Sequence, residues 1–215
     1  LRIFDDEGIP VVLLGYDIVQ PPECGNYDVI GINNCDAGAR LTRHLLSVGA
    51  RRIHFAMTPS ARYEPSCINR VQGVIAALGS MSFDVYTRRN VLVDSFCTPE
   101  ALRRHLKKNK VDAFICCNDA VAASLMQMLT ELNLRVPDDL LVAGFDNVNI
   151  ARLVTPTLTT IDQPCDRIAQ VAFRQLSLRI AEPGAVPMEM FLPAPLVVRA
   201  STTRTMRTKK PVCAG

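Results

Sequence analysis

The stretch from residue 136 to residue 164, VPDDLLVAGFDNVNIARLVTPTLTTIDQP, indicates the fold of this chain. An apolar run at 140–145 predicts a buried strand, which ends in a polar pair, Asp146 and Asn147. A short polar loop follows, and a second short strand is predicted at 158–161. In open α/β sheets the C-terminal ends of the strands face the ligand crevice, so Asp146 is predicted to carry its carboxylate to a binding site.

Short apolar runs alternate with amphipathic helical patterns along the whole chain. The helix predicted at 34–49 stops at Gly49, and Thr98-Pro99 starts another with an N-cap hydroxyl and a proline in the first turn. Strand and helix alternate at crossover spacing, which predicts an α/β fold with a doubly wound parallel sheet. Further strands are predicted at 10–14, 29–32, 52–57, 91–93, 111–117 and within 188–199, and further helices at 65–78, 119–134 and 165–181.

Composition indicates a soluble globular protein of ordinary charge. The hydrophobic share is 48%, and the formal net charge of +3 is too small to argue for nucleic acid or an acidic membrane as a partner. We find no signal peptide and no apolar run long enough to span a bilayer, and we expect no membrane association. The eight cysteines form no C-x-x-C pair, so we expect no metal site, reduced thiols and a cytoplasmic location.

An enzymatic function has little support in the sequence. The chain has no G-x-S-x-G elbow, no glycine-rich phosphate loop and no H-E-x-x-H motif, so we predict neither catalysis nor a cofactor. His44 and His105 fall on predicted helices and His54 on a predicted strand. The basic residues around His105 predict a solvated helix face.

Six motifs, in order, resemble the effector-binding core of the LacI/GalR family of bacterial transcription regulators. One motif alone is a weak signal, but six with the right spacing are strong. Family members usually open the first motif with Asp-Asn, whereas this chain has Asn33-Asn34. The motifs are NNCDAGARLTRHLLSVGARRI (33–53), SCINRVQG (66–73), VDAFICCNDAVAASL (111–125), VPDDLLVAGFDN (136–147), TPTLTTIDQP (155–164) and LVVRAST (196–202).

The resemblance implies a periplasmic-binding-protein-like fold of two α/β subdomains, joined by three crossovers, with an effector between them. On this pattern 1–33 and 165–191 form a partial N-terminal subdomain, and 34–164 and 192–203 form the C-terminal subdomain. The basic stretch 204–215 has little apolar content, so we expect a disordered tail there, with a binding arm as the alternative. The family's helix-turn-helix and the first half of its N-terminal subdomain have no counterpart here. We therefore expect Val11, Leu13, Val29 and Ile30 to face water or a partner chain.

Arg70 is the central effector contact that the resemblance implies. A guanidinium is a planar fork of donors suited to hydroxyls or a carboxylate, although a lone arginine is more often a surface residue. Asn118 and Asp119 end the predicted strand at 111–117, where one side chain could cap the next helix while the other contacts ligand. We predict Asn118 as the stronger ligand candidate. By resemblance Asp146 also contacts the effector, and turn formation with Asn147 is its alternative role.

Three further residues complete the predicted site. Phe96 matches a position where family members often place an aromatic ring against the ligand, and core packing is its alternative role. Ser66 precedes Arg70 by four residues and would share its helical face, as a second contact or as the helix cap. Asp17 is predicted to supply the contact from the N-terminal half. Cys165 stands where some members carry an aromatic.

We therefore predict the effector-sensing and dimerisation domain of a bacterial transcriptional regulator, a repressor that binds a small polyhydroxylated ligand such as a sugar. Binding would change the angle between the subdomains of a homodimer and so control DNA binding by a helix-turn-helix absent from this chain. The alternative is a periplasmic or chemotactic sugar-binding protein of the same fold. A small α/β enzyme is a third possibility, which turnover of a bound ligand would reveal.

Overall fold

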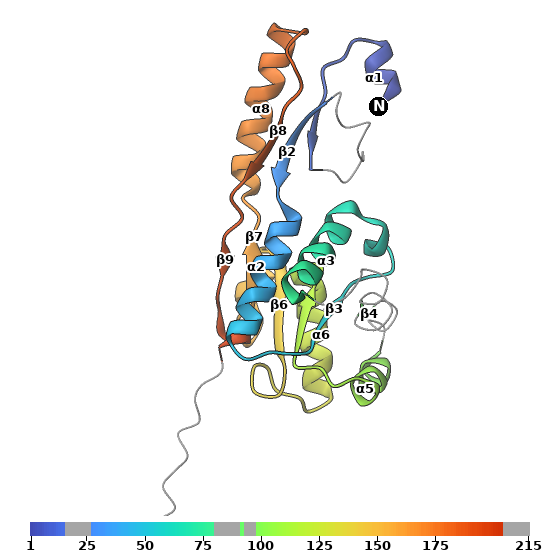
Figure 1. Cartoon of the computed structure of the whole chain (residues 1–215), viewed down its shortest axis with the longest axis vertical. Coiled ribbons are helices and arrows are strands. Elements are labelled where there is room, and N and C mark those ends of the chain that lie inside the picture. Colours follow the sequence, from blue (N-terminus) through green and yellow to red (C-terminus); the bar gives the residue numbers. More distant parts are fainter. Residues whose placement is uncertain (16–26, 80–90, 93–97, 204–215) are drawn as a thin grey trace, which may run out of the picture.

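The computed structural model describes residues 1–15, 27–79, 91–92 and 98–203, which form two parallel-dominated sheets with helices packed on them (Figure 1). In the three-stranded sheet the order is β1 (Val12–Leu14), β2 (Asp28–Ile32), β8 (Glu189–Leu192). In the six-stranded sheet it is β4 (Val91–Leu92), β3 (Ile53–Ala56), β5 (Ala113–Cys116), β6 (Leu141–Asp146), β7 (Thr159–Asp162), β9 (Leu196–Val197). All neighbours pair in parallel except β7 and β9.

The chain passes between the two sheets at three places. β2 of the small sheet leads into α2 (Asn34–Ser47), β7 of the large sheet leads into α8 (Cys165–Ala181), and β8 leads back to β9 (Figure 1). The remaining helices are α1 (Arg2–Asp6), α3 (Pro65–Leu78), α5 (Pro99–Lys108), α6 (Asp119–Glu131) and α7 (Ile150–Leu153), with short 3-10 turns at Ala61–Tyr63 and Ala200–Thr202. The predicted α/β class with parallel-dominated sheets is confirmed.

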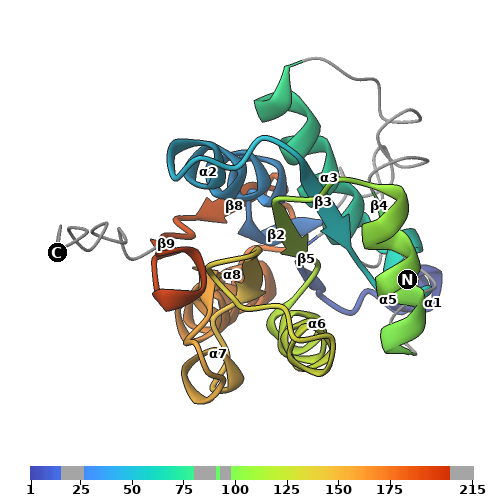
Figure 2. The same cartoon turned by 90° about the horizontal axis from the view of Figure 1, so that it is seen from below.

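The main core lies in the large sheet. β3 and β5 are buried along their whole length, and the largest fully buried side chains include Phe55, Phe114 and Phe145. Figure 2 shows α2 and α3 on one side of this sheet and α6 on the other. Both faces are thus covered, which explains why these strands read as continuous apolar runs rather than as alternating patterns.

Two glycines let α2 and α3 pack closely. A Cβ atom added at Gly73 of α3 would lie 1.9 Å from the carbonyl oxygen of Cys35, and one added at Gly38 of α2 would lie 2.2 Å from that of Arg70. No side chain fits at either position. The glycine of the Arg-x-x-Gly motif therefore sets the spacing of the helix pair and, with it, the position of Arg70.

The small sheet corrects one expectation from the sequence. Leu13, Val29 and Ile30 are 3%, 0% and 1% exposed, so the prediction that they face water or a partner chain was wrong. α8 packs against β1 and β2, and Leu13 and Val29 form a small cluster with the partly buried Val11. Leu14, on the opposite side of the β1 pleat, is exposed instead.

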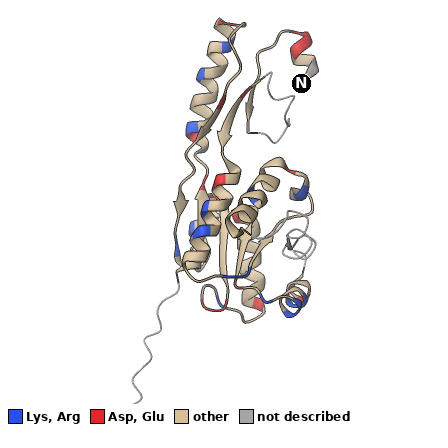
Figure 3. Cartoon of the chain, in the orientation of Figure 1, with Lys and Arg blue, Asp and Glu red and all other residues tan. Residues whose placement is uncertain are grey.

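Most element predictions are close to the observed bounds, with one correction near the site. The polar loop predicted after Asn147 contains α7, a single helical turn. Lys and Arg residues are spread over several elements, α2, α5 and α8 among them, rather than gathered on one (Figure 3). Among the described residues, no helix is both long and apolar enough to cross a bilayer.

Candidate functional site

Arg70 is held from one side by two firm hydrogen bonds. Its Nε donates to Oδ1 of Asn34 at 2.8 Å, and its Nη1 donates to the carbonyl oxygen of Cys117 at 2.5 Å. The guanidinium carbon also lies 4.5 Å from the centroid of the Phe145 ring, at cation–π distance. Arg70 is only 7% exposed, so these contacts fix a buried cation in one orientation.

The remaining nitrogen of Arg70 points to polar groups at longer range. Nη2 lies 3.3 Å from Oδ1 of Asp146 and 3.5 Å from Oε1 of Gln163. All three side chains line a pocket of about 350 Å³. Nη2 and Oδ1 of Asp146 also form an ion pair, and both contacts of Nη2 are longer than a typical N–H···O hydrogen bond. Nη2 is therefore the nitrogen of this guanidinium with the least closely held partners.

Asp146 stands in an uncommon backbone conformation at the end of β6. Its φ is 101°, and that of Asn147 is 57°, both in the left-handed half of conformational space. Asn147 is held by two side chains, because its Nδ2 donates to Asp162 at 2.7 Å and its Oδ1 accepts from Arg199 at 2.6 Å. Strained backbone of this kind persists where surrounding contacts fix it, and it is common at ligand sites. Arg199, in the LVVRAST motif, thus helps to aim Asp146.

Asn118 and Asp119 have different roles although they are neighbours. Asn118 lines the pocket and is also the N-cap of α6, because its Oδ1 accepts from the backbone N–H of Val121 at 2.9 Å. Asp119 is fully buried and lies away from the pocket lining, where it accepts hydrogen bonds from Thr160 Oγ1 at 2.6 Å and from Val148 N at 2.9 Å. Burial raises the pKa of Asp119 to about 6. Asp119 therefore supports the loop after Asp146 rather than the ligand.

A second pocket, of about 170 Å³, adjoins the first and reaches the small sheet. Ser66, Arg70, Gln163 and Cys165 line both. The second pocket adds residues from β1, β2 and the start of α8: Leu14, Ile30, Gly31, Ile32, Ile168 and Ala169, with Gly15 just after β1. The two pockets form one cleft, which we call the Arg70 cleft, with walls from both sheets.

The structure brings Arg70, Asn118, Asp146 and Ser66 together in this cleft. Ser66 is the second residue of α3, and because Glu64 is the N-cap, the alternative role of Ser66 as helix cap was wrong. Asp17 and Phe96 lie outside the described residues. The ligand roles of all six remain predictions.

Sequence reasoning missed two polar residues of the cleft. Gln163 follows β7 as Asp146 ends β6, so the same strand-end argument would have found it. Asn34, at the start of α2, was named only as part of the Asn33-Asn34 pair that opens the first motif, with no role predicted for it. Its contact with Arg70 depends on the packing of α2 against α3, which no local pattern reveals.

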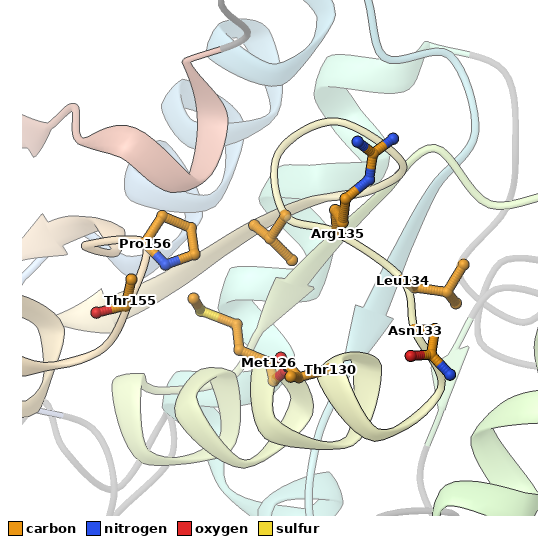
Figure 4. A pocket seen from close by; sticks show the side chains of 8 residues that line it. Met126, Thr130, Asn133, Leu134, Arg135, Thr155 and Pro156 are labelled. Atoms are coloured by element: carbon orange, nitrogen blue, oxygen red, sulfur yellow. The ribbon is translucent and has the colours of Figure 1, made fainter.

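Another pocket, of about 410 Å³, lies at the far end of α6 from Asn118. Met126 and Thr130 of α6 face the loop of Thr155 and Pro156 across it (Figure 4). Its one charged lining residue, Arg135, is paired with Asp138 and Asp139. This groove offers no buried charged group to orient a ligand, in contrast with the Arg70 cleft. Within the described ranges, no three His, Cys, Asp or Glu side chains are placed to hold a metal ion.

Comparisons with known proteins agree with this architecture. A family model described as a periplasmic binding protein-like domain matches residues 42–202. The HTH-type transcriptional regulator YvdE of Bacillus subtilis (strain 168) is 30% identical over 213 residues, which cover 94% of this chain and 63% of the relative. The HTH-type transcriptional repressor PurR of Mannheimia succiniciproducens is 30% identical over 201 residues, which cover 91% of this chain and 58% of that repressor.

A solved structure, the complex of the transcriptional regulator CelR with cellobiose, superposes with a TM-score of 0.79 at 27% identity, covering 93% of this chain and 61% of that one. The chain thus spans about three fifths of the length of these proteins. They are transcriptional regulators rather than enzymes, and the resemblance inferred from the six motifs is confirmed. The chain belongs to the family of periplasmic-binding-protein-like domains, in the form that LacI/GalR-type regulators carry.

Proposed function

We propose that the Arg70 cleft binds a small polyhydroxylated effector, a sugar, and that this binding controls the DNA affinity of a transcriptional repressor. The observation that carries the proposal is the buried, oriented guanidinium of Arg70, with Nη2 and the carboxylate of Asp146 converging on one pocket. Vicinal hydroxyls of a sugar can accept from Nη2 and donate to the carboxylate at the same time. The amides of Asn118 and Gln163 add further donors and acceptors.

The similarity to CelR supports a sugar as the ligand class, because that regulator was solved with cellobiose. The volumes of the two pockets, about 350 and 170 Å³, suit a small molecule. Apolar lining from Ile30, Ile32 and Ile168 can cover the C–H face of a sugar ring while the polar wall orients its hydroxyls.

A ligand in the cleft would touch both sheets at once. The small sheet contributes Ile30 and Ile32, and the large sheet and its helices contribute Arg70 and Asp146. A ligand that bridges two bodies favours the arrangement in which both sets of contacts form, so binding shifts their relative orientation. We propose this shift as the signal to the DNA-binding part.

DNA contact would come from a helix-turn-helix outside this chain, as the names of the HTH-type relatives suggest. Paired DNA-binding heads require a homodimer, which we propose as the working form. Exposed apolar side chains on α8 and β8, among them Phe173, Ile180 and Phe191, offer surface for a second copy. A regulator of bacterial transcription works in the cytoplasm. Sedimentation of the full regulator would test the homodimer.

Calorimetric titration tests the ligand class directly. Cellobiose, a disaccharide, and D-ribose, a monosaccharide, are the two probes. We expect saturable binding of at least one sugar, weakened in Arg70→Ala by about 1–3 kcal/mol, as for the loss of a charged hydrogen bond. Arg62→Ala is the matched control, because Arg62 is exposed and lines neither pocket. Equal affinities of the wild type and Arg70→Ala for the bound sugar would refute the site.

A further inference from the structure

Three cysteines gather at the cleft that holds Arg70. Cys67 of α3, Cys117 after β5 and Cys165 of α8 line the same pocket, and all three are free thiols. Cys67 and Cys117 are 2% and 4% exposed in residue terms, yet both reach the pocket wall. Thiols are weak hydrogen-bond partners for a polar ligand, so ligand recognition does not account for them.

The thiols of Cys67 and Cys117 are in direct contact. The Cys67 S–H donates a hydrogen bond to the sulfur of Cys117, which lowers the pKa of Cys117 and raises that of Cys67. A backbone hydrogen bond from Thr58 and the positive charge of Arg70 also favour the Cys117 thiolate, whereas burial and the charge of Glu64 oppose it without outweighing these effects on its pKa. The pair thus has distinct roles, because one sulfur is predisposed to ionise while the other keeps its proton.

We propose that Cys67 and Cys117 form an oxidisable dithiol in the wall of the Arg70 cleft, which hydrogen peroxide converts to a disulfide. The Cys117 thiolate attacks one peroxide oxygen, so an S–O bond forms, the O–O bond breaks and hydroxide leaves. The sulfur of Cys67 then attacks the resulting sulfenic acid, so an S–S bond forms and the S–O bond breaks. Two thiols lose two electrons and two protons, and one peroxide becomes two waters.

Formation of the disulfide would affect the position of Arg70, because both cysteines are close to it. The carbonyl of Cys117 is the acceptor for Nη1 of Arg70 at 2.5 Å, and Cys67 precedes Arg70 by one helical turn. A disulfide draws the two sulfurs to about 2.05 Å, closer than any hydrogen-bonded pair. Oxidation therefore couples the position of the guanidinium to the redox state of the dithiol. The inference goes beyond the proposed function, because the bond forms without a ligand.

Peptide mapping of the whole 215-residue chain tests the proposal. After peroxide treatment, free thiols are blocked with N-ethylmaleimide and the protein is cleaved with trypsin. Cys67 falls in the peptide 63–70, YEPSCINR, and Cys117 in the peptide 111–135. We expect these two peptides linked and released by dithiothreitol, with a mass two hydrogen atoms below their sum plus one N-ethylmaleimide on the free Cys116. Recovery of both as blocked thiols, at a peroxide dose that oxidises the exposed Cys35 and Cys165, would overturn the proposal.

Single variants identify the sulfurs involved. The peptide 111–135 also contains Cys116, so the link should survive in Cys116→Ala and vanish in Cys117→Ser. Cys165→Ser is the matched control, because Cys165 lines the same pocket without a role in the bond. In Cys67→Ser, dimedone should trap a sulfenic acid on Cys117. A link that persists in Cys117→Ser, or that disappears in Cys165→Ser, would show that a different pair reacts.

Discussion

Arg70 and Asp146, 76 positions apart in sequence, meet at the pocket with Nη2 3.3 Å from Oδ1. The arginine side chain is 9% exposed and the aspartate side chain 31%, so a buried donor faces a partly open acceptor. Asn34 and Cys117 fix the guanidinium from behind. A ligand hydroxyl that entered between the two groups would therefore displace the 3.3 Å contact and leave the arginine held by Asn34 and Cys117.

The close contact of α2 and α3 predicts a large cost for Gly73→Ala. The added Cβ would lie 1.9 Å from the carbonyl oxygen of Cys35, so the helices must separate. We expect the free energy of unfolding to fall by about 2–3 kcal/mol, as for overpacked cores, measured by urea denaturation. Gln72→Ala, on the exposed side of the same helix, should change it by less than about 0.5 kcal/mol. Matching losses in the two variants would contradict the role assigned to Gly73.

Ionisation of the buried Asp119 carboxyl is expected to make the protein less stable as the pH rises. Burial raises its pKa from 3.8 to about 6, an effect that hydrogen bonds from Thr160 and Val148 oppose and the charge of Asp146 enhances. Between these values the folded state holds a proton that the unfolded chain has released. The contribution of Asp119 to the free energy of unfolding is therefore complete below about pH 4 and is lost as the pH rises through about 6.

The free energy of unfolding of wild type, measured against that of Asp119→Asn, should therefore decrease from pH 4 to pH 7, because the neutral amide does not ionise. Asp112→Asn supplies the control, because the stabilising contribution of the Asp112 carboxylate is lost only as the pH falls through a folded-state pKa below 3.8. The corresponding difference for this variant should therefore barely change from pH 4 to pH 7. Burial raises the pKa of Asp112, but hydrogen bonds from Arg52 and Arg51 outweigh it and lower the pKa overall. A flat difference for Asp119→Asn across this range would disprove the buried carboxyl assignment.

His54 and His105 form a neutral pair whose protonation opposes folding. His54 Nδ1 lies 3.0 Å from His105 Nε2, and both rings pack near Phe114. Burial lowers the pKa of His54 to about 4, with a further decrease from His105 and an increase from Asp112, and burial also lowers the pKa of His105. The unfolded chain binds protons below 6.5 that the folded state excludes, so stability is lost as the pH falls toward 4.

In His54→Gln a hydrogen-bonding partner for His105 remains, but one of the two titrating rings is gone. We expect this variant to lose less stability than wild type between pH 7 and pH 5, in urea denaturation at both values. An equal or greater loss in His54→Gln would count against the pair as a source of acid sensitivity.

A buried ion pair holds the small sheet to α8. Oδ2 of Asp28, a fully buried residue, accepts from Nε and Nη2 of Arg179 at 2.9 and 2.6 Å, while Oδ1 accepts from Gln175 and from the Met188 backbone. Arg179→Met leaves the carboxylate without its counter-charge and should cost about 3–5 kcal/mol in urea denaturation. Arg174→Met, exposed on the same helix, should be nearly neutral. If the urea midpoints of both variants equal that of the wild type, the ion pair makes no measurable contribution to the free energy of unfolding.

Periodicity predicted the long elements well, because their apolar faces are continuous. The bounds of α3 and α8 match the predicted 65–78 and 165–181. Periodicity did not predict α7, because a single helical turn with an exposed Leu153 leaves no periodic apolar pattern. Strand-end logic led to Asp146 and Asn118, since position along a parallel strand fixes which sheet edge a residue reaches.

Local sequence could not separate Asn118 from Asp119. Both are small polar residues after the same strand, and the difference arises from Thr160, 41 positions further on, which binds Asp119. The contact between Asn34 and Arg70 likewise depends on helix packing through Gly38 and Gly73. Roles that rest on long-range contacts become visible only in three dimensions.

A crystal structure of the chain with the sugar that titrates best tests the central claim most directly. The account predicts ligand density in the Arg70 cleft, with one hydroxyl oxygen within hydrogen-bond distance of Arg70 Nη2 and another within that of the Asp146 carboxylate. Density for the sugar in the groove between Met126 and Pro156, with the Arg70 cleft holding only water, would contradict it.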